Sequence, residues 1–137
     1  MSTKPTLLAI CDDVRLEIGG KISVIGLYDT IALPAIPGGA NLCVTTRWNS
    51  AGPARATVAL FMLTPDNPAP IPVITQQIEL ADHEGLGFCS AGTIAKFSWQ
   101  FHAGGMHHIV VTLDGREAGT IPLMVRKLPQ AERPVVR

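Results

Sequence analysis

Two aspartates in the N-terminal part of the chain have the spacing that chemistry would need. If Gly19-Gly20 is the two-residue loop of a β-hairpin, Asp12 lies opposite Leu27 and becomes a diagonal neighbour of Asp29 on a largely apolar face. Such a pair can share a proton or hold a hard cation. The alternative is structural, with the carboxylates accepting hydrogen bonds from loop backbone or pairing with an arginine. The arginines considered for that role are Arg15 and Arg47.

Four histidines raise a second hypothesis, a transition-metal site. His102 and His107 flank a turn and could face each other, and His83 or Cys89 would then complete three ligands. His107 and His108 are adjacent on a predicted strand, so they point to opposite faces and cannot both reach one ion. There is no His-x-His or His-Glu-x-x-His pattern. The simpler interpretation packs His107 at the end of the sheet and leaves His108 solvated, so we expect no metal and no cofactor.

Motifs for nucleophilic catalysis or phosphate binding are missing from the sequence. There is no Gly-x-Ser-x-Gly elbow, no Walker loop and no Gly-x-Gly-x-x-Gly between a strand and a helix. The three cysteines, Cys11, Cys43 and Cys89, are widely spaced and form no Cys-x-x-Cys. They are interpreted as reduced, buried residues. We therefore expect no catalytic residue.

Composition narrows the range of partners. Eleven Lys and Arg balance eleven Asp and Glu, which predicts no general attraction to nucleic acid or to an anionic membrane. The chain is 47% hydrophobic and only 5% aromatic, and a neutral, apolar chain tends to self-associate. Residues 6–11 are apolar, but Asp12-Asp13 ends that run short of a signal peptide or membrane span. A cytoplasmic location is therefore expected.

The elements that must position all these residues are strands. Apolar residues alternate at period two, and no stretch sustains a period of 3.6. Strands are predicted at residues 6–17, 21–31, 41–49, 55–63, 71–80, 93–101, 106–113 and 117–126. Turns rich in glycine and proline separate them. The pattern predicts an all-β fold, an immunoglobulin-like antiparallel β-sandwich of 7–9 strands over residues 1–126, followed by an extended or disordered tail at 127–137. A β-barrel is the alternative architecture for such a series of short strands.

The most specific local prediction concerns the hairpin of residues 106–125. Asp114-Gly115 suits a two-residue type I′ turn, because both residue types accept positive φ. A regular ladder from that turn would set the apolar face of one strand against the polar face of the other. One additional residue restores the match, so we predict a β-bulge near Gly119.

Alternation also predicts which residues are buried and which meet a partner. Phe97, Trp99 and Phe101 share one strand face that something must cover, and together with Trp48 they are predicted to form a protein interface. The predicted core residues are Leu8, Ile10, Val24, Ile25, Leu42, Val44, Val58, Leu60, Ile109, Val111, Leu123 and Val125.

Two motifs resemble those of a known family. Residues 11–28 contain Asp-Asp-Val-Arg followed by Gly-Lys-x-Ser-x-x-Gly-x-Tyr, and the chain continues to a Leu-Asp-Gly turn and a Pro-Leu-x-Val strand at residues 122–125. In this respect residues 6–126 resemble a family of small uncharacterised β-sandwich proteins of bacterial or phage origin. The resemblance implies a fold and no catalytic residue. Its usual pattern has an aromatic residue where His107 stands here.

These observations favour a non-catalytic binding or structural module that acts through protein–protein contacts. The expected partners are further copies of itself or other proteins of a larger assembly, such as a phage-type particle, with no nucleic acid and no membrane. The opposing hypothesis is a metal-dependent, hydrolase-like enzyme that uses Asp12 and Asp29 or the region of His102 and His107.

Overall fold

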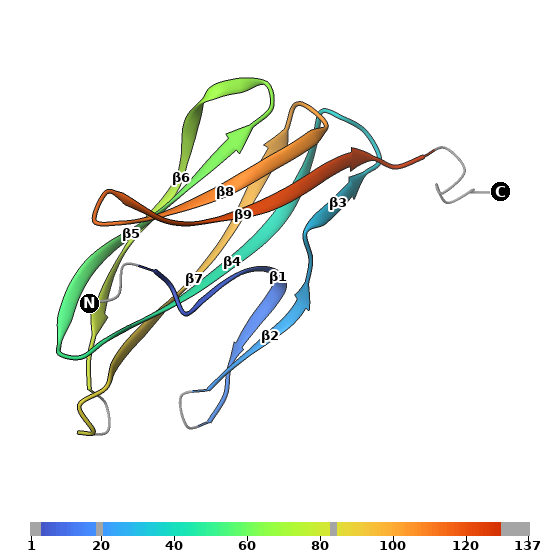
Figure 1. Ribbon diagram of the computed structural model, residues 1–137. Coiled ribbons are helices and arrows are strands. Elements are labelled where there is room, and N and C mark those ends of the chain that lie inside the picture. Colours follow the sequence, from blue (N-terminus) through green and yellow to red (C-terminus); the bar gives the residue numbers. More distant parts are fainter. Residues whose placement is uncertain (1–3, 19–20, 83–84, 130–137) are drawn as a thin grey trace.

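The chain folds into two packed β-sheets (Figure 1). The computed structural model describes residues 4–18, 21–82 and 85–129, and within these ranges it contains nine strands and no helix. The strands are β1 (Leu7–Leu16), β2 (Ile22–Leu27), β3 (Thr30–Leu33), β4 (Gly38–Ser50), β5 (Ala54–Thr64), β6 (Asn67–Leu80), β7 (Cys89–Phe101), β8 (Gly105–Leu113) and β9 (Arg116–Lys127). The all-β prediction is confirmed.

The two sheets differ in strand order and size. Sheet A has the order β2-β1-β4-β7, and sheet B has the order β3-β9-β8-β5-β6. All neighbours are antiparallel except β3 and β9, which run parallel. β8 is therefore the middle strand of sheet B, with β9 and β5 on either side of it. β6 lies at one edge of sheet B, and β7 lies at one edge of sheet A.

The single strand predicted at residues 21–31 is wrong. β2 pairs with β1 in sheet A, and the chain then crosses to sheet B, where β3 pairs with β9. Gly26 has φ +69° just before the crossing, and the Asp29 carbonyl accepts a hydrogen bond from the Met124 amide at 2.8 Å just after it.

The C-terminal hairpin has the predicted geometry. Asp114 and Gly115 have φ of 50° and 83°. The ladder shifts between Val111 and Thr112, so that Val111 pairs with Gly119 and Ala118 is the additional residue. The bulge beside Gly119 is confirmed, and it returns Leu123 and Val125 to the face that is buried.

The core lies between the sheets and holds most of the predicted residues. Leu8 is half-buried against it, and Val24 packs into a smaller second cluster around Cys11, Val14 and Cys43. Ile25 was predicted to be buried and is 38% exposed, because β2 is an edge strand. The remaining nine predicted core residues are buried: Ile10, Leu42, Val44, Val58, Leu60, Ile109, Val111, Leu123 and Val125.

A short chain of hydrogen bonds fixes the largest buried side chain. Trp48 Nε1 donates to Thr46 Oγ1 at 2.8 Å, and the Thr46 and Thr93 hydroxyls are 2.6 Å apart. All three side chains are buried, so their polar atoms need partners within the protein. The network anchors β4 to β7 and holds the indole inside the domain.

Candidate interaction surface

The predicted pairing of Asp12 with Asp29 is wrong. β1 and β2 pair Cys11 with Leu27 and Asp13 with Ile25, a register one residue away from the predicted one. Asp12 then lies against the backbone of Gly26, and both aspartates are exposed. Asp29 has already left sheet A for sheet B, where it accepts a hydrogen bond from the Thr30 hydroxyl. No apolar face joins the two carboxylates.

Asp13, next to Asp12 on β1, has charged partners that give it a structural role. Its carboxylate lies 2.9 Å from Lys96 Nζ and 4.0 Å from Arg15 Nε, and it accepts a hydrogen bond from the Val14 amide at 2.9 Å. The bond from Lys96, followed by that from Val14, lowers the pKa of Asp13 below its ordinary value, and the same ion pair raises the pKa of Lys96. This ion pair ties β1 to β7 across β4.

The cysteines match the structural interpretation. All three are buried and free. Cys11 and Cys43 are direct neighbours across β1 and β4, and burial together with the nearby Cys43 raises the pKa of Cys11 to about 11. A thiol with so high a pKa holds almost no thiolate near neutral pH and is a poor nucleophile.

The histidines fall into different environments. His102 and His107 line one hollow at the end of the sandwich, where His107 is fully buried and packs edge-on against Phe101. His108 is half-buried on the opposite face of β8, and Cys89 begins β7 at the far end from Phe101. His83 lies outside the described residues. The described part of the chain holds no group of three His, Cys, Asp or Glu able to bind a metal ion.

The four aromatic residues predicted to form an interface face the interior. Trp48 and Phe101 are each 1% exposed and belong to the core. Phe97 and Trp99 pack against that core with their ring centroids 6.5 Å apart. Trp48 and Phe101 therefore present no surface to another chain, whereas Phe97 and Trp99 are half-buried and keep part of their surface exposed.

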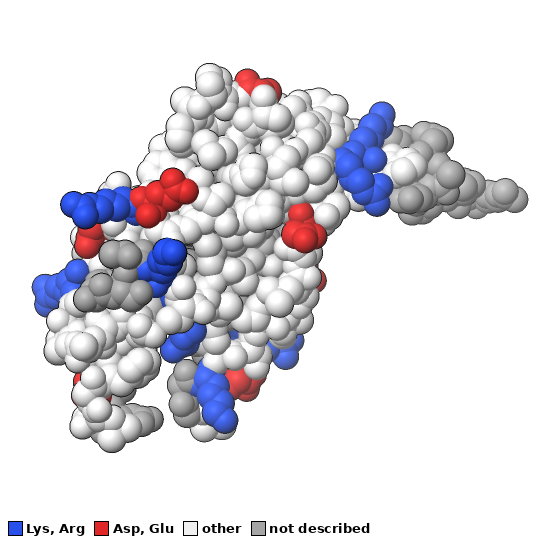
Figure 2. Space-filling model, viewed as in Figure 1, with Lys and Arg blue, Asp and Glu red and all other residues white. Residues whose placement is uncertain are grey.

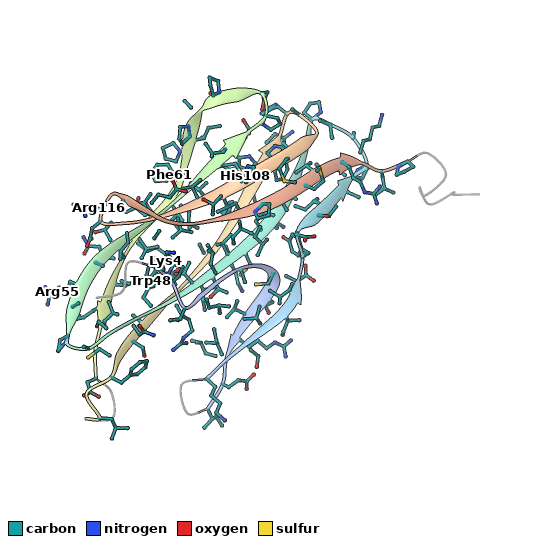
Figure 3. The ribbon with its side chains drawn as sticks, viewed as in Figure 1. Lys4, Trp48, Arg55, Phe61, His108 and Arg116 are labelled. Carbon is teal, nitrogen blue, oxygen red and sulfur yellow. The ribbon has the colours of Figure 1, made fainter. Side chains whose placement is uncertain are left out.

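The structure instead reveals an apolar surface on the outside of sheet B. We call it the outer face of sheet B. Phe61 of β5 lies beside Val110 of β8, and Leu63 of β5 lies beside His108 of β8. On its other side, His108 lies beside Pro122 of β9. Phe61, Leu63 and Val110 are half-buried and Met106 is 42% exposed. Figure 3 labels Phe61 and His108 on this sheet.

Charged groups are confined to the margins of this surface. Residues 57–64, 67–78, 105–113 and 118–125, which form most of β5, β6, β8 and β9, contain no Asp, Glu, Lys or Arg. Arg55 and Glu79 form an exposed ion pair at 3.8 Å near one end of the sheet. Figure 2 shows a broad white area with blue and red patches around its edges.

The sequence itself contains a pattern that indicates this surface. Residues 58–63, Val-Ala-Leu-Phe-Met-Leu, are apolar in both phases of the alternation. A strand that faces water on one side should alternate, whereas a strand covered on both faces reads as a continuous apolar run. The side chains of this run that point inward pack against sheet A. Those that point outward belong to the outer face of sheet B.

Fold and surface together define a class, an all-β domain of two sheets with an uncharged outer face. A family model described as "Family of unknown function (DUF6941)" matches residues 6–126, and the chain belongs to this family. No curated protein matches the chain.

Two solved structures show a distant likeness to the chain. One is the Pseudomonas fluorescens alkylpurine DNA glycosylase AlkC bound to DNA containing an abasic site analog, with 14% identity, a TM-score of 0.48, and coverage of 87% of this chain and 30% of that one. Another is the Bifidobacterium adolescentis GH3 beta-glucosidase, with 14% identity, a TM-score of 0.39, and coverage of 94% of this chain and 19% of that one. This chain spans less than a third of either protein.

Proposed function

We propose that the protein is a non-catalytic binding and structural module that self-associates through the outer face of sheet B. The observation that carries the proposal is the outward side of the interior strands β5 and β8, which over residues 57–64 and 105–113 holds no Asp, Glu, Lys or Arg. Its apolar residues are Ala59, Phe61, Leu63, Met106 and Val110, and the uncharged polar residues Thr57, His108 and Thr112 lie among them. Large apolar surfaces on otherwise soluble domains mark interaction sites. No motif or cluster described above supports a particular reaction.

A second copy of the same chain is the occupant that fits this face. Two such faces can meet about a two-fold axis, which places each apolar row against its own equivalent. Because this face carries no Asp, Glu, Lys or Arg away from its margins, two copies of it can meet without repulsion between like charges. The four long strands β6, β5, β8 and β9, about 4.8 Å apart and about 30 Å long, give a contact of roughly 600 Å², somewhat below the roughly 800 Å² per partner of standard interfaces.

The direct test is sedimentation velocity on the purified chain at micromolar concentration. The intact protein should sediment as a dimer or larger species, and Phe61→Asp should sediment as a monomer because a carboxylate in the contact would lose its water. Leu27→Asp is the matched control, since Leu27 is a 68% exposed apolar residue on β2 in the other sheet. A monomeric wild type, or a Phe61→Asp variant that assembles as well as Leu27→Asp, would contradict the proposal.

The enzyme hypothesis has a separate test. A metal-dependent hydrolase centred on Asp12 and Asp29, or on His102 and His107, would purify with stoichiometric zinc, iron or manganese. We expect elemental analysis to find none, and we expect Asp12→Asn to leave assembly unchanged. Stoichiometric metal that His107→Phe removes would favour the enzyme.

We also infer the finer fold assignment and the setting. The order β9-β8-β5 matches strands G, F and C of the immunoglobulin sandwich, and the pair β4-β7 matches strands B and E. A cytoplasmic assembly component, of which a phage-type particle is one example, suits a neutral domain of this kind.

A further inference from the structure

A pocket lies at the end of the sandwich where the β5–β6 turn meets the β7–β8 turn. Its volume is about 360 Å³, the lower range of small-molecule sites. We call it the end pocket. It is lined by Thr64, Asp66, Asn67, Ile71, Trp99, Gln100, Phe101, His102 and His107.

His107 gives the end pocket a polar atom without a partner. The side chain is 0% exposed, and its Nδ1 lies 3.0 Å from the Gly105 carbonyl. A carbonyl oxygen can only accept, so Nδ1 carries the proton and Nε2 is left with a free lone pair. Nε2 is buried and has no hydrogen-bond partner.

A second unpartnered atom belongs to the neighbouring strand. Thr64 Oγ1 is also buried without a hydrogen-bond partner. The β5–β8 ladder pairs Leu63 with His108, and its continuation by one residue places Thr64 opposite His107. Buried polar groups nearly always have partners, so these two atoms need one, either ordered water or a bound solute. Both residues line the end pocket, which is the space from which such a partner could reach them.

The remaining walls restrict the chemistry of that group. Trp99, Phe101 and Ile71 supply apolar and aromatic surface, which suits an aliphatic stem and the face-on attraction of a cation. Among the described residues that line the pocket, Asp66 is the only Asp, Glu, Lys or Arg. Nε2 and the Asp66 carboxylate both accept hydrogen bonds, so the complementary head group donates them and carries positive charge.

We propose that the end pocket is a binding site for a small primary alkylammonium compound, with its N–H groups on His107 Nε2 and Thr64 Oγ1 and its stem against Trp99. A metal ion is a poorer match, because the described residues offer no group of three ligands. This site is separate from the outer face of sheet B, and its occupancy does not require assembly.

Nuclear magnetic resonance of the imidazole nitrogens of the intact protein tests the site directly. Titration with n-butylammonium should shift the His107 Nε2 resonance saturably, with a Kd on the order of millimolar for so small a probe. Pentanoate has the same butyl stem and the opposite charge, and it should bind at least tenfold more weakly. A His107 Nε2 that ignores n-butylammonium, or equal affinity for pentanoate, would overturn the proposal.

Variants separate the end pocket from general surface binding. Thr64→Val removes one proposed acceptor while keeping the size of the side chain, and Asp66→Asn removes the charge. Each should weaken n-butylammonium binding several-fold without unfolding the protein. His108→Phe is the matched control on the opposite face of β8 and should leave the titration unchanged; an equal loss in this variant would also count against the site.

Discussion

Gly26 shows how one residue can limit a whole hairpin. Its φ of +69° is a left-handed conformation, and a Cβ added there would meet the Asp12 carboxylate. Gly26→Ala should therefore lower the free energy of unfolding by about 1–2 kcal/mol. Urea unfolding measures this change. The double variant Asp12→Ala/Gly26→Ala should recover only the contact part, because the backbone strain remains; full recovery would show that φ is not limiting.

The Asp13–Lys96 ion pair should make stability depend on pH in a defined window. The pKa of Asp13 is lowered in the folded state, so its contribution exists above the unfolded carboxyl pKa of about 3.9 and disappears as the pH falls through the folded value. The pKa of Lys96 is raised, so its contribution exists below about 10.4 and is lost as the pH rises through the folded value.

Asp13→Asn is the variant that isolates this charge, because an asparagine oxygen can still accept from the Val14 amide. It should be less stable than the wild type at pH 7, and the difference should shrink as the pH falls below about 3.9, as measured by urea unfolding at pH 7 and at pH 2. The difference at pH 7 should be small, since the pair is exposed. A difference as large at pH 2 as at pH 7 would assign the effect to something other than the ion pair.

At the level of elements, the β8–β9 hairpin depends on the number of residues more than on their identity. Ala118 is the additional residue of the bulge, and its deletion would move every later residue of β9 to the opposite face. Leu123 and Val125 would then leave the core. Deletion of Ala118 should cost several kcal/mol or prevent folding, since each large core side chain contributes about 2–5 kcal/mol.

Ala118→Ser is the control for that deletion, because it keeps the residue count at a half-buried position. Its unfolding midpoint should lie close to that of the wild type. Circular dichroism and urea unfolding of both variants report the outcome. A well-folded deletion variant would show that β9 can shift its register, in which case the bulge would not be what fixes its buried face.

The two hairpins show what the sequence could and could not predict about elements. Asp114-Gly115 demands positive φ at two residues, which fixes the loop length, and the apolar pattern then requires the bulge. Gly19-Gly20 makes no such demand. The Glu17 amide donates to the Lys21 carbonyl at 2.7 Å, so the connection holds three residues where two were predicted. This one additional residue in the connection shifts the register of β1 against β2 by one residue. Asp12 therefore no longer lies diagonal to Asp29.

At the scale of the whole molecule, alternation predicted the core better than the surface. The inward phase of β5 and β8 followed from local pattern, because burial of one phase is a property of the strand. Which aromatic residues stay exposed depends on how the sheets pack. Phe97, Trp99 and Phe101 form an apolar row in either case, and only the packing of the two sheets shows that Phe101 is buried while Phe97 and Trp99 are half-buried. His107 was placed at the end of the sheet by its position before the hairpin, whereas its unpartnered Nε2 is a tertiary property.

Self-association through the outer face of sheet B also predicts how stability depends on concentration. A partner that binds only the folded chain stabilises it by mass action, by about 2.7 kcal/mol at a hundredfold excess over Kd. For a chain of this length, that corresponds to a Tm increase of roughly 5–10 °C. With a Kd on the order of 1 µM, thermal unfolding followed by circular dichroism should show such a rise between dilute and 100 µM protein.

Phe61→Asp removes the contact, so its Tm should not depend on concentration, whereas that of Leu27→Asp should rise as in the wild type. Comparison of the three proteins separates the outer face of sheet B from a general effect of adding a charge. Because the dimer and the end pocket lie on different parts of the fold, n-butylammonium should raise the Tm of Phe61→Asp as much as that of the wild type at low protein concentration. If the Tm of the wild type and that of Phe61→Asp were equally independent of concentration, the domain would act as a monomer, and its uncharged outer face would have to serve a different protein.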